Sequence, residues 1–414
     1  MKNILNSKII LLPTLHYFTL TAIGGLGNIF NISVLGKIGL LILLSGIFIT
    51  IKYFFYEKIK PFDLFLIFFL TSLAFIGLFS SYPQELYWYG VRYQLALTLF
   101  YFVGKSSDFK DWTFFNNMKI PILVVAIIGL YLYFSPPSWY IAWKLSSTTK
   151  FSSESRILEM TRLSAFWEYP YWISYSAALL YHYIIYKMFW GGTKIINIAT
   201  LIFLTCIVFL TQQRAPLVFI GFSTLYFFIN SFFYINKKFR ITILILISIY
   251  ILLFTITLYT VLDASRIDFI MNKFDSLFSM QNSGLVSERL NLYSDFLNKE
   301  VTFFGDGIGR YSHLAYEMNL KAITDSQYIQ IMYENGIYGC IGYCIIFGYI
   351  LLKSLKHYKY NLFEIGVILF YLLAMIGANP LSNQGIHTVF LWICCGRIVS
   401  KSCIMYKRVN NTIN

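Results

Sequence analysis

The amino-acid sequence predicts an all-α, polytopic integral membrane protein with about twelve transmembrane helices. The first observation is composition: of 414 residues, 57% are hydrophobic and only 13% are charged, with a mean hydropathy of +0.63. A soluble domain does not have this balance, because polar residues must cover its water-facing surface. The second is that apolar residues gather in segments of roughly 20, the length that crosses a bilayer. The third is the uneven distribution of lysine and arginine between those segments.

The first predicted span follows Lys2 and Lys8 and has no A-x-A-like cleavage site, so we interpret it as an uncleaved anchor. No soluble domain, linker or fixed-period repeat interrupts the chain, and residues 1–414 are predicted to form a single transmembrane domain. The predicted spans, with boundaries good to a few residues, are 9–27, 34–54, 62–80, 86–103, 119–136, 171–189, 195–212, 214–235, 241–262, 327–351, 362–378 and 386–400.

Lysine and arginine predict the orientation of these spans. If the N-terminus is cytoplasmic, 20 of the 33 basic residues fall on cytoplasmic segments, and the short segments on the other face carry little more than Lys37, Arg92 and Arg214. We therefore predict that both termini face the cytoplasm and that two long loops, about 136–170 and 263–326, face outward. The net charge of +14 is then mostly cytoplasmic flank, so nucleic-acid binding is not expected.

The two outer loops are long enough to be functional. Both contain aromatic and aliphatic residues, which favours ordered structure over disorder. Within the second loop, residues 287–298 place apolar residues at helical spacing, with Ser287 as a plausible N-cap. We predict an amphipathic helix there, lying at the membrane surface where lipid-linked substrates would be reached. The six cysteines lie in or beside spans without zinc-ligand spacing, and we interpret them as apolar packing residues.

The most informative stretch runs from Arg289 to Gly339. It contains R-L-N-L-Y-S-D-F-L-N, then F-G-D-G-I-G-R-Y-S-H, then T-D-S-Q-Y and E-N-G-I-Y-G. Glycines 305, 307 and 309 would let the backbone approach a ligand closely. Arg289 and Arg310 carry planar five-donor groups suited to phosphate.

Other residues of this stretch allow more than one interpretation. Arg289 could instead occupy a solvated helix face, and Asp325 could be the N-cap of the next helix. His313 could be a solvated loop histidine, and Glu334 is interpreted as a buried structural partner.

A second group of polar residues immediately precedes the span at 171–189. It reads R-L-S-A-F-W-E-Y-P-Y-W, from Arg162 to Trp172. Arg162 could bind phosphate or sugar and Glu168 could contact a hydroxyl. The alternative is an interfacial arginine held by lipid headgroups.

A third element, L-T-Q-Q-R-A-P-L-V, joins two spans with almost no loop and places Arg214 at the outer face. A charge at this depth is costly and usually has a partner, although simple snorkelling is the alternative. Pro216 fits the first turn of the following helix, whose free N–H groups could also meet an anion.

The order of these elements resembles the O-antigen polymerase and O-antigen ligase superfamily over roughly residues 160–345. That family carries R-x-(S/T)-G-x-F-x-x-P-x-Y, then T-x-x-R-(G/A/S)-x-(L/I), then G-x-G-x-G, (H/D)-(N/S)-x-Y and E-x-G-(I/L)-x-G. Ala165 stands where the family has glycine, which weakens the first match. Asp325 stands where ligases carry histidine and many polymerases carry an acid.

The resemblance implies a GT-C-like, metal-independent, inverting glycosyltransferase of the bacterial inner membrane, with no cofactor. Its donor and acceptor would be undecaprenyl-diphosphate-linked oligosaccharides, joined at the periplasmic face, with membrane lipids and a chain-length regulator protein as further candidate partners. We expect catalytic roles for Asp325, Arg289 and Arg214, because fixed arginines would stabilise the leaving diphosphate and a carboxylate could act as base. We expect substrate binding by Arg162, Glu168, Arg310 and His313.

Two alternatives to a polymerase remain open. The first is an O-antigen ligase that transfers the finished glycan to lipid A–core, and the aspartate at position 325 favours the polymerase over it. The second is a polysaccharide transporter or flippase. Transporters tend to place ionisable groups at the membrane midplane and broken helices in repeated halves, whereas here the charges gather in outer loops.

Overall fold

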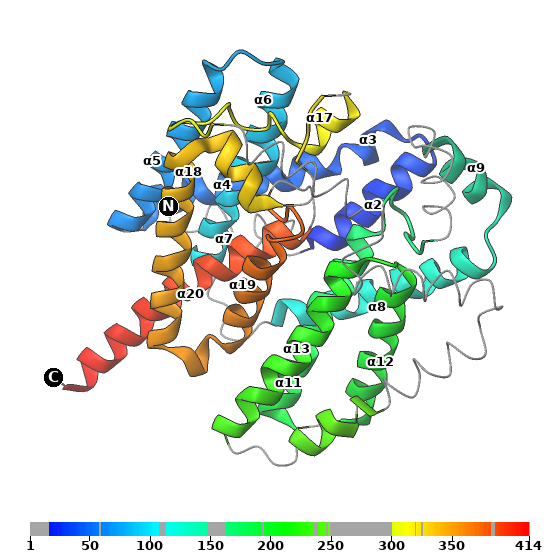
Figure 1. The fold of residues 1–414 in the computed structure, drawn as a ribbon. Helices are drawn as coiled ribbons and strands as arrows, with labels where there is room; N and C mark the ends of the chain where they lie inside the picture. Colours follow the sequence, from blue (N-terminus) through cyan, green and yellow to red (C-terminus); the bar gives the residue numbers. More distant parts are fainter. Residues whose placement is uncertain are drawn as a thin grey trace.

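The computed structural model describes residues 16–57, 59–106, 113–147, 162–192, 194–234, 239–245, 247–248, 300–318, 320–323, 326–381 and 386–413. Within this part of the chain the fold is all helical, with no strand, which agrees with the predicted class (Figure 1). Arg289, Asp325 and the amphipathic helix predicted at 287–298 lie outside the described residues.

The described helices follow closely on one another along the chain. In order they are α2 (Tyr17–Ile29), α3 (Ser33–Gly36), α4 (Ile38–Tyr56), α5 (Pro61–Leu78), α6 (Gln84–Gly90), η1 (Val91–Leu95), η2 (Ala96–Leu99), α7 (Phe100–Ser106), α8 (Thr113–Phe134), α9 (Ser138–Ser147), α11 (Tyr171–Gly191), α12 (Ile195–Leu210), α13 (Arg214–Phe233), α17 (His313–Glu317), α18 (Gln327–Lys356), η3 (Tyr358–Tyr360), α19 (Leu362–Ala374) and α20 (Ile386–Ile413).

Most of the predicted spans coincide with helices of the structure. The exception is 241–262, most of which lies outside the described residues. Among the described residues, four helices are long and apolar enough to cross a membrane, namely Pro61–Leu78, Phe115–Phe134, Arg214–Phe233 and Gln327–Lys356. Shorter apolar helices accompany them at Leu40–Phe55, Ile195–Leu210, Leu362–Ala374 and His387–Ser400. These are the helices of a membrane-embedded protein, and the number twelve stays a prediction.

The segment 86–103, predicted as one span, is divided in the structure. A π-helical turn, η1, follows α6 and is itself followed by the 3₁₀ turn η2 and then by α7. A π turn accommodates an extra residue and so rotates the side chains that follow it. Hydropathy is continuous through this segment, so the sequence pattern did not reveal the change.

The helix α18, also predicted as one span, is broken at Gly336. This residue has φ +64° and ψ −164°, a backbone conformation that favours glycine and ends one helical segment before the next begins. At the start of α18 the N-cap is Ser326, whose side chain accepts a hydrogen bond from the Ile329 N–H at 3.5 Å. The capping role considered for Asp325 is therefore filled by its neighbour.

Glycines permit the closest helix crossing in the fold. A Cβ added at Gly104 of α7 would lie 2.1 Å from the Ile393 carbonyl oxygen of α20, and one at Gly396 would lie 1.9 Å from that of Tyr101. Small residues of this kind let membrane helices approach backbone to backbone. In Figure 1, α11, α12 and α13 form a second group in the lower part of the view.

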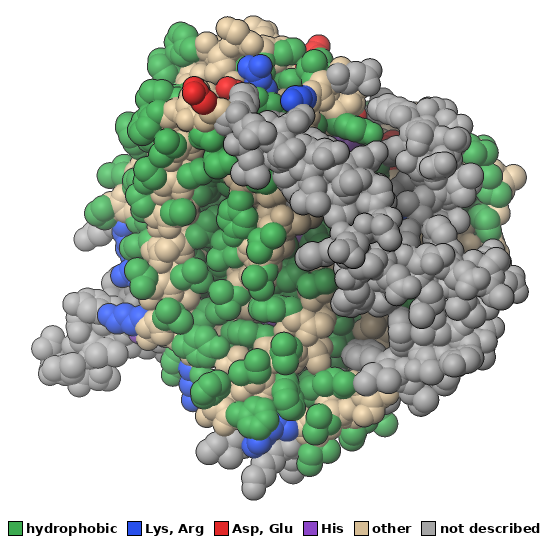
Figure 2. Space-filling model, viewed as in Figure 1, with side chains coloured by type: hydrophobic (Ala, Val, Ile, Leu, Met, Phe, Trp, Pro, Cys, Tyr) green, Lys and Arg blue, Asp and Glu red, His purple; other side chains and the backbone are tan. Residues whose placement is uncertain are grey.

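Charged side chains lie toward the ends of the visible face. Figure 2 shows hydrophobic side chains over its middle, acidic and basic ones at the upper end, and basic ones toward the lower end and the lower left edge. The upper end is formed in part by α6 and α17 (Figure 1). An apolar band between charged ends is typical of a bilayer-embedded bundle.

Candidate functional site

The loop at 301–312 fills the break in α18. The backbone N–H groups of Asp306 and Gly307 donate to the carbonyl oxygens of Tyr333 and Glu334, at 2.8 and 2.9 Å. The N–H groups of Ile337 and Tyr338 donate to the Thr302 and Phe303 carbonyl oxygens, at 3.4 and 3.0 Å. Backbone groups freed by a helix break must find partners inside a membrane protein, and this loop supplies them.

The glycines of this loop serve contacts within the protein. A Cβ at Gly305 would lie 2.4 Å from the Glu334 carbonyl oxygen, and one at Gly309 would lie 2.1 Å from that of Leu86 in α6. Glycines 305, 307 and 309 all have positive φ, at 75°, 108° and 82°. The sequence interpretation assigned this close approach to a ligand. The structure corrects it, because the loop is clamped between α6 and α18.

Glu334 is the polar centre of this clamp, and only 1% of it is exposed. Its Oε1 accepts from the Tyr311 backbone N–H at 2.8 Å and from Gln330 Nε2 at 3.0 Å, and its Oε2 accepts from Gln94 Nε2 at 2.7 Å. Asn379 extends the network, since its Nδ2 donates to Gln330 Oε1 at 2.8 Å. Glu334 is thus the buried structural partner that the sequence predicts. Charge-assisted bonds to three different elements fix the segment that carries Arg310.

A tyrosine beside α6 adds another contact to the same loop. The Tyr82 hydroxyl donates to the Ile308 carbonyl oxygen at 2.6 Å. Burial first, and then the negative charge of Glu334, raise the pKa of Tyr82 well above its usual range. Tyr82 therefore remains a protonated donor and holds the loop at physiological pH.

Arg310 and His313 follow the clamp directly. The guanidinium of Arg310 is half-buried and lies 5.9 Å from the centre of the Tyr311 ring. The next two positions hold buried polar atoms, Ser312 Oγ and His313 Nδ1, which have no hydrogen-bond partner among the described residues. Such atoms are costly unless something satisfies them, so they are the groups here most suited to bind a polar substrate.

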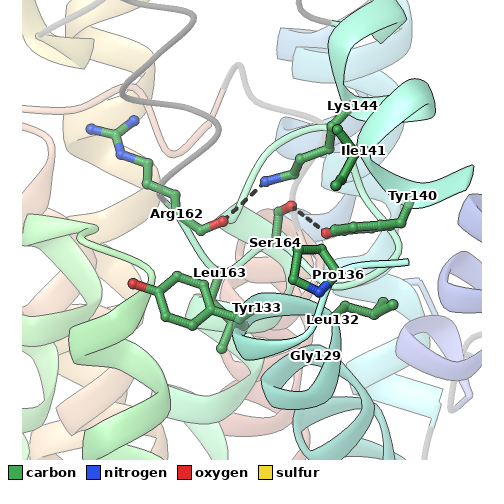
Figure 3. Close-up of a pocket in the computed structure, with 10 residues that line it drawn as sticks. All are labelled: Gly129, Leu132, Tyr133, Pro136, Tyr140, Ile141, Lys144, Arg162, Leu163 and Ser164. Atoms are coloured by element: carbon green, nitrogen blue, oxygen red, sulfur yellow. Dashed lines mark hydrogen bonds between the residues drawn. The ribbon is translucent and has the colours of Figure 1, made fainter. Parts of the chain in front are cut away.

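The segment that begins at Arg162 is held by its backbone (Figure 3). Lys144, which is buried on α9, donates from Nζ to the Arg162 carbonyl oxygen at 3.0 Å. The Tyr140 hydroxyl donates to the Ala165 carbonyl oxygen at 2.9 Å. Figure 3 shows the Arg162 guanidinium extending away from Tyr140 and Lys144, at the rim of a pocket of about 370 Å³. The main chain of Arg162 is fixed while its cation is left to face outward.

Ala165 has φ +51°, the left-handed region that favours glycine. The superfamily motif has glycine at this position, so the backbone conformation explains the family residue. The match is therefore closer in structure than in sequence. The neighbouring side chain of Glu168 is exposed.

Contacts bring the arginine-bearing segments to one region. The Leu163 N–H donates to the Leu210 carbonyl oxygen at 3.1 Å, which places the Arg162 segment against the turn that precedes Arg214. The rings of Tyr169 and His313 lie 6.4 Å apart, which joins the same segment to the loop of Arg310. Arg162, Arg214, Arg310, Glu168 and His313 thus belong to segments in mutual contact. The described residues do not extend to Arg289 or Asp325.

Arg214 is the first residue of α13 and is exposed, with Pro216 buried in the first turn, as predicted. Gln213, at the N-cap, makes no side-chain cap.

Sequence reasoning missed the polar partners of Glu334. Gln94 lies inside an apolar segment and Asn379 follows a span, so neither forms a motif. A signal was present in Gln330 and Glu334, which are four residues apart and therefore share one helix face. The sequence also treated Arg92 only as a topology marker.

Comparison with known proteins supports the family resemblance. Residues 199–344 match a family model described as O-antigen ligase, a region that includes Arg214, the clamp loop and the break in α18. No curated protein is significantly similar in sequence to the chain. The matched region, in the order of motifs found in the sequence, identifies the chain as carrying the domain of the O-antigen polymerase and ligase superfamily, whose members are glycosyl-transferring enzymes.

Proposed function

We propose that this protein is a polysaccharide polymerase. It joins oligosaccharide repeat units carried on undecaprenyl diphosphate, at the periplasmic face of a bacterial inner membrane. The observation that carries the proposal is the meeting of the Arg162 segment with the Arg214 turn and the Arg310 loop. Cations from distant parts of the chain, held on a fixed backbone, suit a concentrated negative charge.

The chemistry requires stabilisation of the leaving group. The acceptor hydroxyl oxygen attacks the anomeric carbon of the donor sugar as the bond from that carbon to the diphosphate oxygen breaks. Charge then builds on the diphosphate, and the arginines stabilise it by preorganised hydrogen bonds. The proton of the acceptor hydroxyl passes to a base, for which Asp325 is our candidate, at a gain of about 10²–10⁴-fold.

The break in α18 resembles one feature of transporters. In transporters, unwound backbone coordinates the cargo. Here the freed groups on both sides of the break bond instead to the 301–312 loop. This arrangement favours an enzyme with a fixed site over alternating access.

The test is gene deletion followed by gel analysis of the surface polysaccharide. Loss of a polymerase leaves single repeat units attached to their acceptor. Loss of a ligase leaves the acceptor without any repeat, and loss of a flippase also removes repeats from the surface. The single-repeat outcome supports the proposal, and either of the others contradicts it. Complementation with Arg214→Lys should give only single repeats, because a lysine point charge lacks the planar fork.

A ligase is the second candidate, because O-antigen ligase is the description of the matching family model. Asp325 can discriminate between the two. Since Ser326 caps α18, replacing Asp325 should not act through loss of a helix cap. Asp325→Asn should abolish polymerisation at normal membrane levels, and Asp325→His should retain partial activity because imidazole can accept a proton. A fully active Asn variant removes Asp325 from the mechanism.

A further inference from the structure

The π turn η1 sends neighbouring polar side chains in different directions. Gln94 reaches Glu334 of α18, whereas Arg92, two residues earlier, lines a groove formed with α2 and α4. The Arg92 guanidinium lies 4.9 Å from the centre of the Tyr93 ring. Turns of this type occur frequently at functional sites. The network of Glu334 explains Gln94 and leaves Arg92 unexplained.

The groove is otherwise apolar and aromatic. It has a volume of about 490 Å³, and the walls around Arg92 include Leu43 of α4, Leu97 of η2 and Trp172 of α11. Among the described residues, no carboxylate forms an ion pair with Arg92. An arginine within a predicted span, beside apolar walls and without an acidic partner, is costly unless an anion meets it.

The position of Arg92 matches the depth of lipid phosphates. It lies eight residues after the start of α6 at Gln84, which corresponds to about 12 Å along a helix. On the predicted topology that end of α6 is the outer one. One wall of the groove continues into α4, which exposes Leu40, Leu41, Leu44 and Phe48 on its surface. A cation at the head and an apolar wall along the side complement an amphiphile with a phosphate end.

We propose that this groove binds the phosphate end of a polyprenyl-linked substrate. Arg92 donates hydrogen bonds to the phosphate oxygens, and the first isoprene units lie along α2 and α4. The choice of a polyprenyl lipid rests on the proposed function, whereas the phosphate and the apolar chain follow from the groove itself.

The groove adjoins the arginine-bearing segments. Trp172 in its wall stacks on Trp167 of the Arg162 segment, with ring centres 6.1 Å apart. Gly90, two residues before Arg92, touches Gly309 of the clamp loop, since a Cβ at Gly90 would lie 2.7 Å from the Gly309 nitrogen. The bound lipid therefore presents its head group next to both segments.

The experiment measures lipid capture by the full-length protein in nanodiscs. The probe is a polyprenyl phosphate with a photoreactive diazirine in its first isoprene units. It should label peptides containing Tyr17 or Leu43 in the wild-type protein. Arg92→Gln should lower this labelling about tenfold or more, the factor expected from losing a hydrogen bond to a charged group. Arg92→Lys should fall between the two.

Arg240→Gln is the matched control. Its guanidinium also lies over an aromatic ring, 4.6 Å from the centre of Phe232, but Arg240 does not line the groove. Its labelling should equal that of the wild type. Leu43→Trp provides a second route, since it fills the groove and keeps Arg92; it too should reduce labelling. Undiminished labelling in both Arg92→Gln and Leu43→Trp overturns the proposal.

Competitors distinguish the sources of phosphate. Unlabelled polyprenyl phosphate should compete, whereas polyprenol, phosphatidylglycerol and inorganic pyrophosphate should compete at least about tenfold less well. Equal competition by phosphatidylglycerol shows an ordinary lipid contact, and equal competition by pyrophosphate shows a free-anion site; either overturns the proposal. This readout needs no polymerisation, so a deletion strain with normal polysaccharide would contradict the proposed function and leave the lipid-binding result standing on its own.

Discussion

Two glycine contacts in this molecule look alike in distance and differ in what they require. Where α7 crosses α20, Gly104 and Gly396 belong to regular helices and provide only space. Where the clamp loop meets α18, Gly305 and Gly336 provide space and also adopt positive φ, at 75° and 64°. The first contact joins two apolar helices by packing. The second is built from backbone hydrogen bonds and surrounds the buried carboxylate of Glu334. We infer that the first holds the fold together and the second holds the site.

The largest effect is expected at the helix crossing. In Gly396→Leu, a side chain would have to occupy space 1.9 Å from the Tyr101 carbonyl oxygen, and backbone cannot move aside as a flexible side chain can. Overpacking typically costs about 1–3 kcal/mol, and a backbone clash costs more. The full-length protein should fall to a small fraction of its normal membrane level, measured by quantitative immunoblot.

Gly348→Leu is the control for this change. Gly348 lies in α18, and nothing lies within 4 Å of an added Cβ. Its protein level should stay near that of the wild type. Equal losses in both variants would mean that membrane insertion, and not the crossing, limits the amount of protein.

A smaller effect on the fold and a large one on activity are expected from Gly305→Ala. The added methyl group would meet the Glu334 carbonyl oxygen at 2.4 Å, so the loop must lift from α18 and carry Arg310 with it. Protein levels should remain within about twofold of normal, while polymer length on gels collapses toward single repeats.

Gly192→Ala separates strain from displacement in this experiment. Gly192 has φ +83°, but nothing lies within 4 Å of its added Cβ. It should lose only the conformational cost of about 1–2 kcal/mol and keep normal polymer. Normal polymer in Gly305→Ala would show that the clamp does not position the site.

A moderate effect is expected from Glu334→Gln. All three printed partners of the carboxylate, Gln94 Nε2, Gln330 Nε2 and the Tyr311 N–H, are donors, and the amide of glutamine would face at least one of them with another donor. The expected cost is about 1–3 kcal/mol in the free energy of unfolding. Gln94→Glu in the same chain should recover part of it, by at least about 0.5 kcal/mol in a double-mutant cycle. Thermal unfolding in detergent measures the four proteins, and strictly additive losses would contradict the direct contact.

The smallest effect is expected at Ala165, the one position where the chain departs from the family glycine. Ala165→Gly removes the strain of φ +51°, about 1–2 kcal/mol, and also removes a buried methyl group worth about 0.8 kcal/mol. The net gain should be below about 1 kcal/mol, seen as a slightly higher Tm. A lower Tm would show that packing of the methyl group against Gly129 outweighs the backbone strain.

The sequence predicts the helical fold and the general location of the site because both depend on local patterns. Long apolar segments report helices directly, and the motif order locates the arginines. The clamp could not be predicted in the same way. Gln94 and Glu334 are 240 residues apart, and neither belongs to a pattern that indicates the other. The glycine cluster was located correctly and assigned to the wrong contact, because sequence shows that a glycine allows close approach without showing what approaches.

The break in α18 also escaped the hydropathy pattern. Its glycine is one of several within an apolar segment, and only the positive φ distinguishes Gly336 from helical glycines such as Gly339 and Gly342. The π turn at η1 has no sequence signature for the same reason. Both irregularities depend on tertiary hydrogen bonds, which enclose Glu334 from two sides.

The clamp has a consequence for how the protein is made. Tyr82 and Ile308 are joined by a hydrogen bond across 226 positions of chain. At a synthesis rate of about 5–20 residues per second, the outer end of α6 waits roughly 10–45 s for its partner to leave the ribosome. Until then the groove around Gly90 is open, and α18, which follows the loop in the chain, has not been made. Closure is therefore among the last steps of biogenesis. A chain terminated before residue 300 would contain most of the apolar helices and still lack the segment that ties its early part to its late part, which gives cellular quality control a defined lesion to recognise.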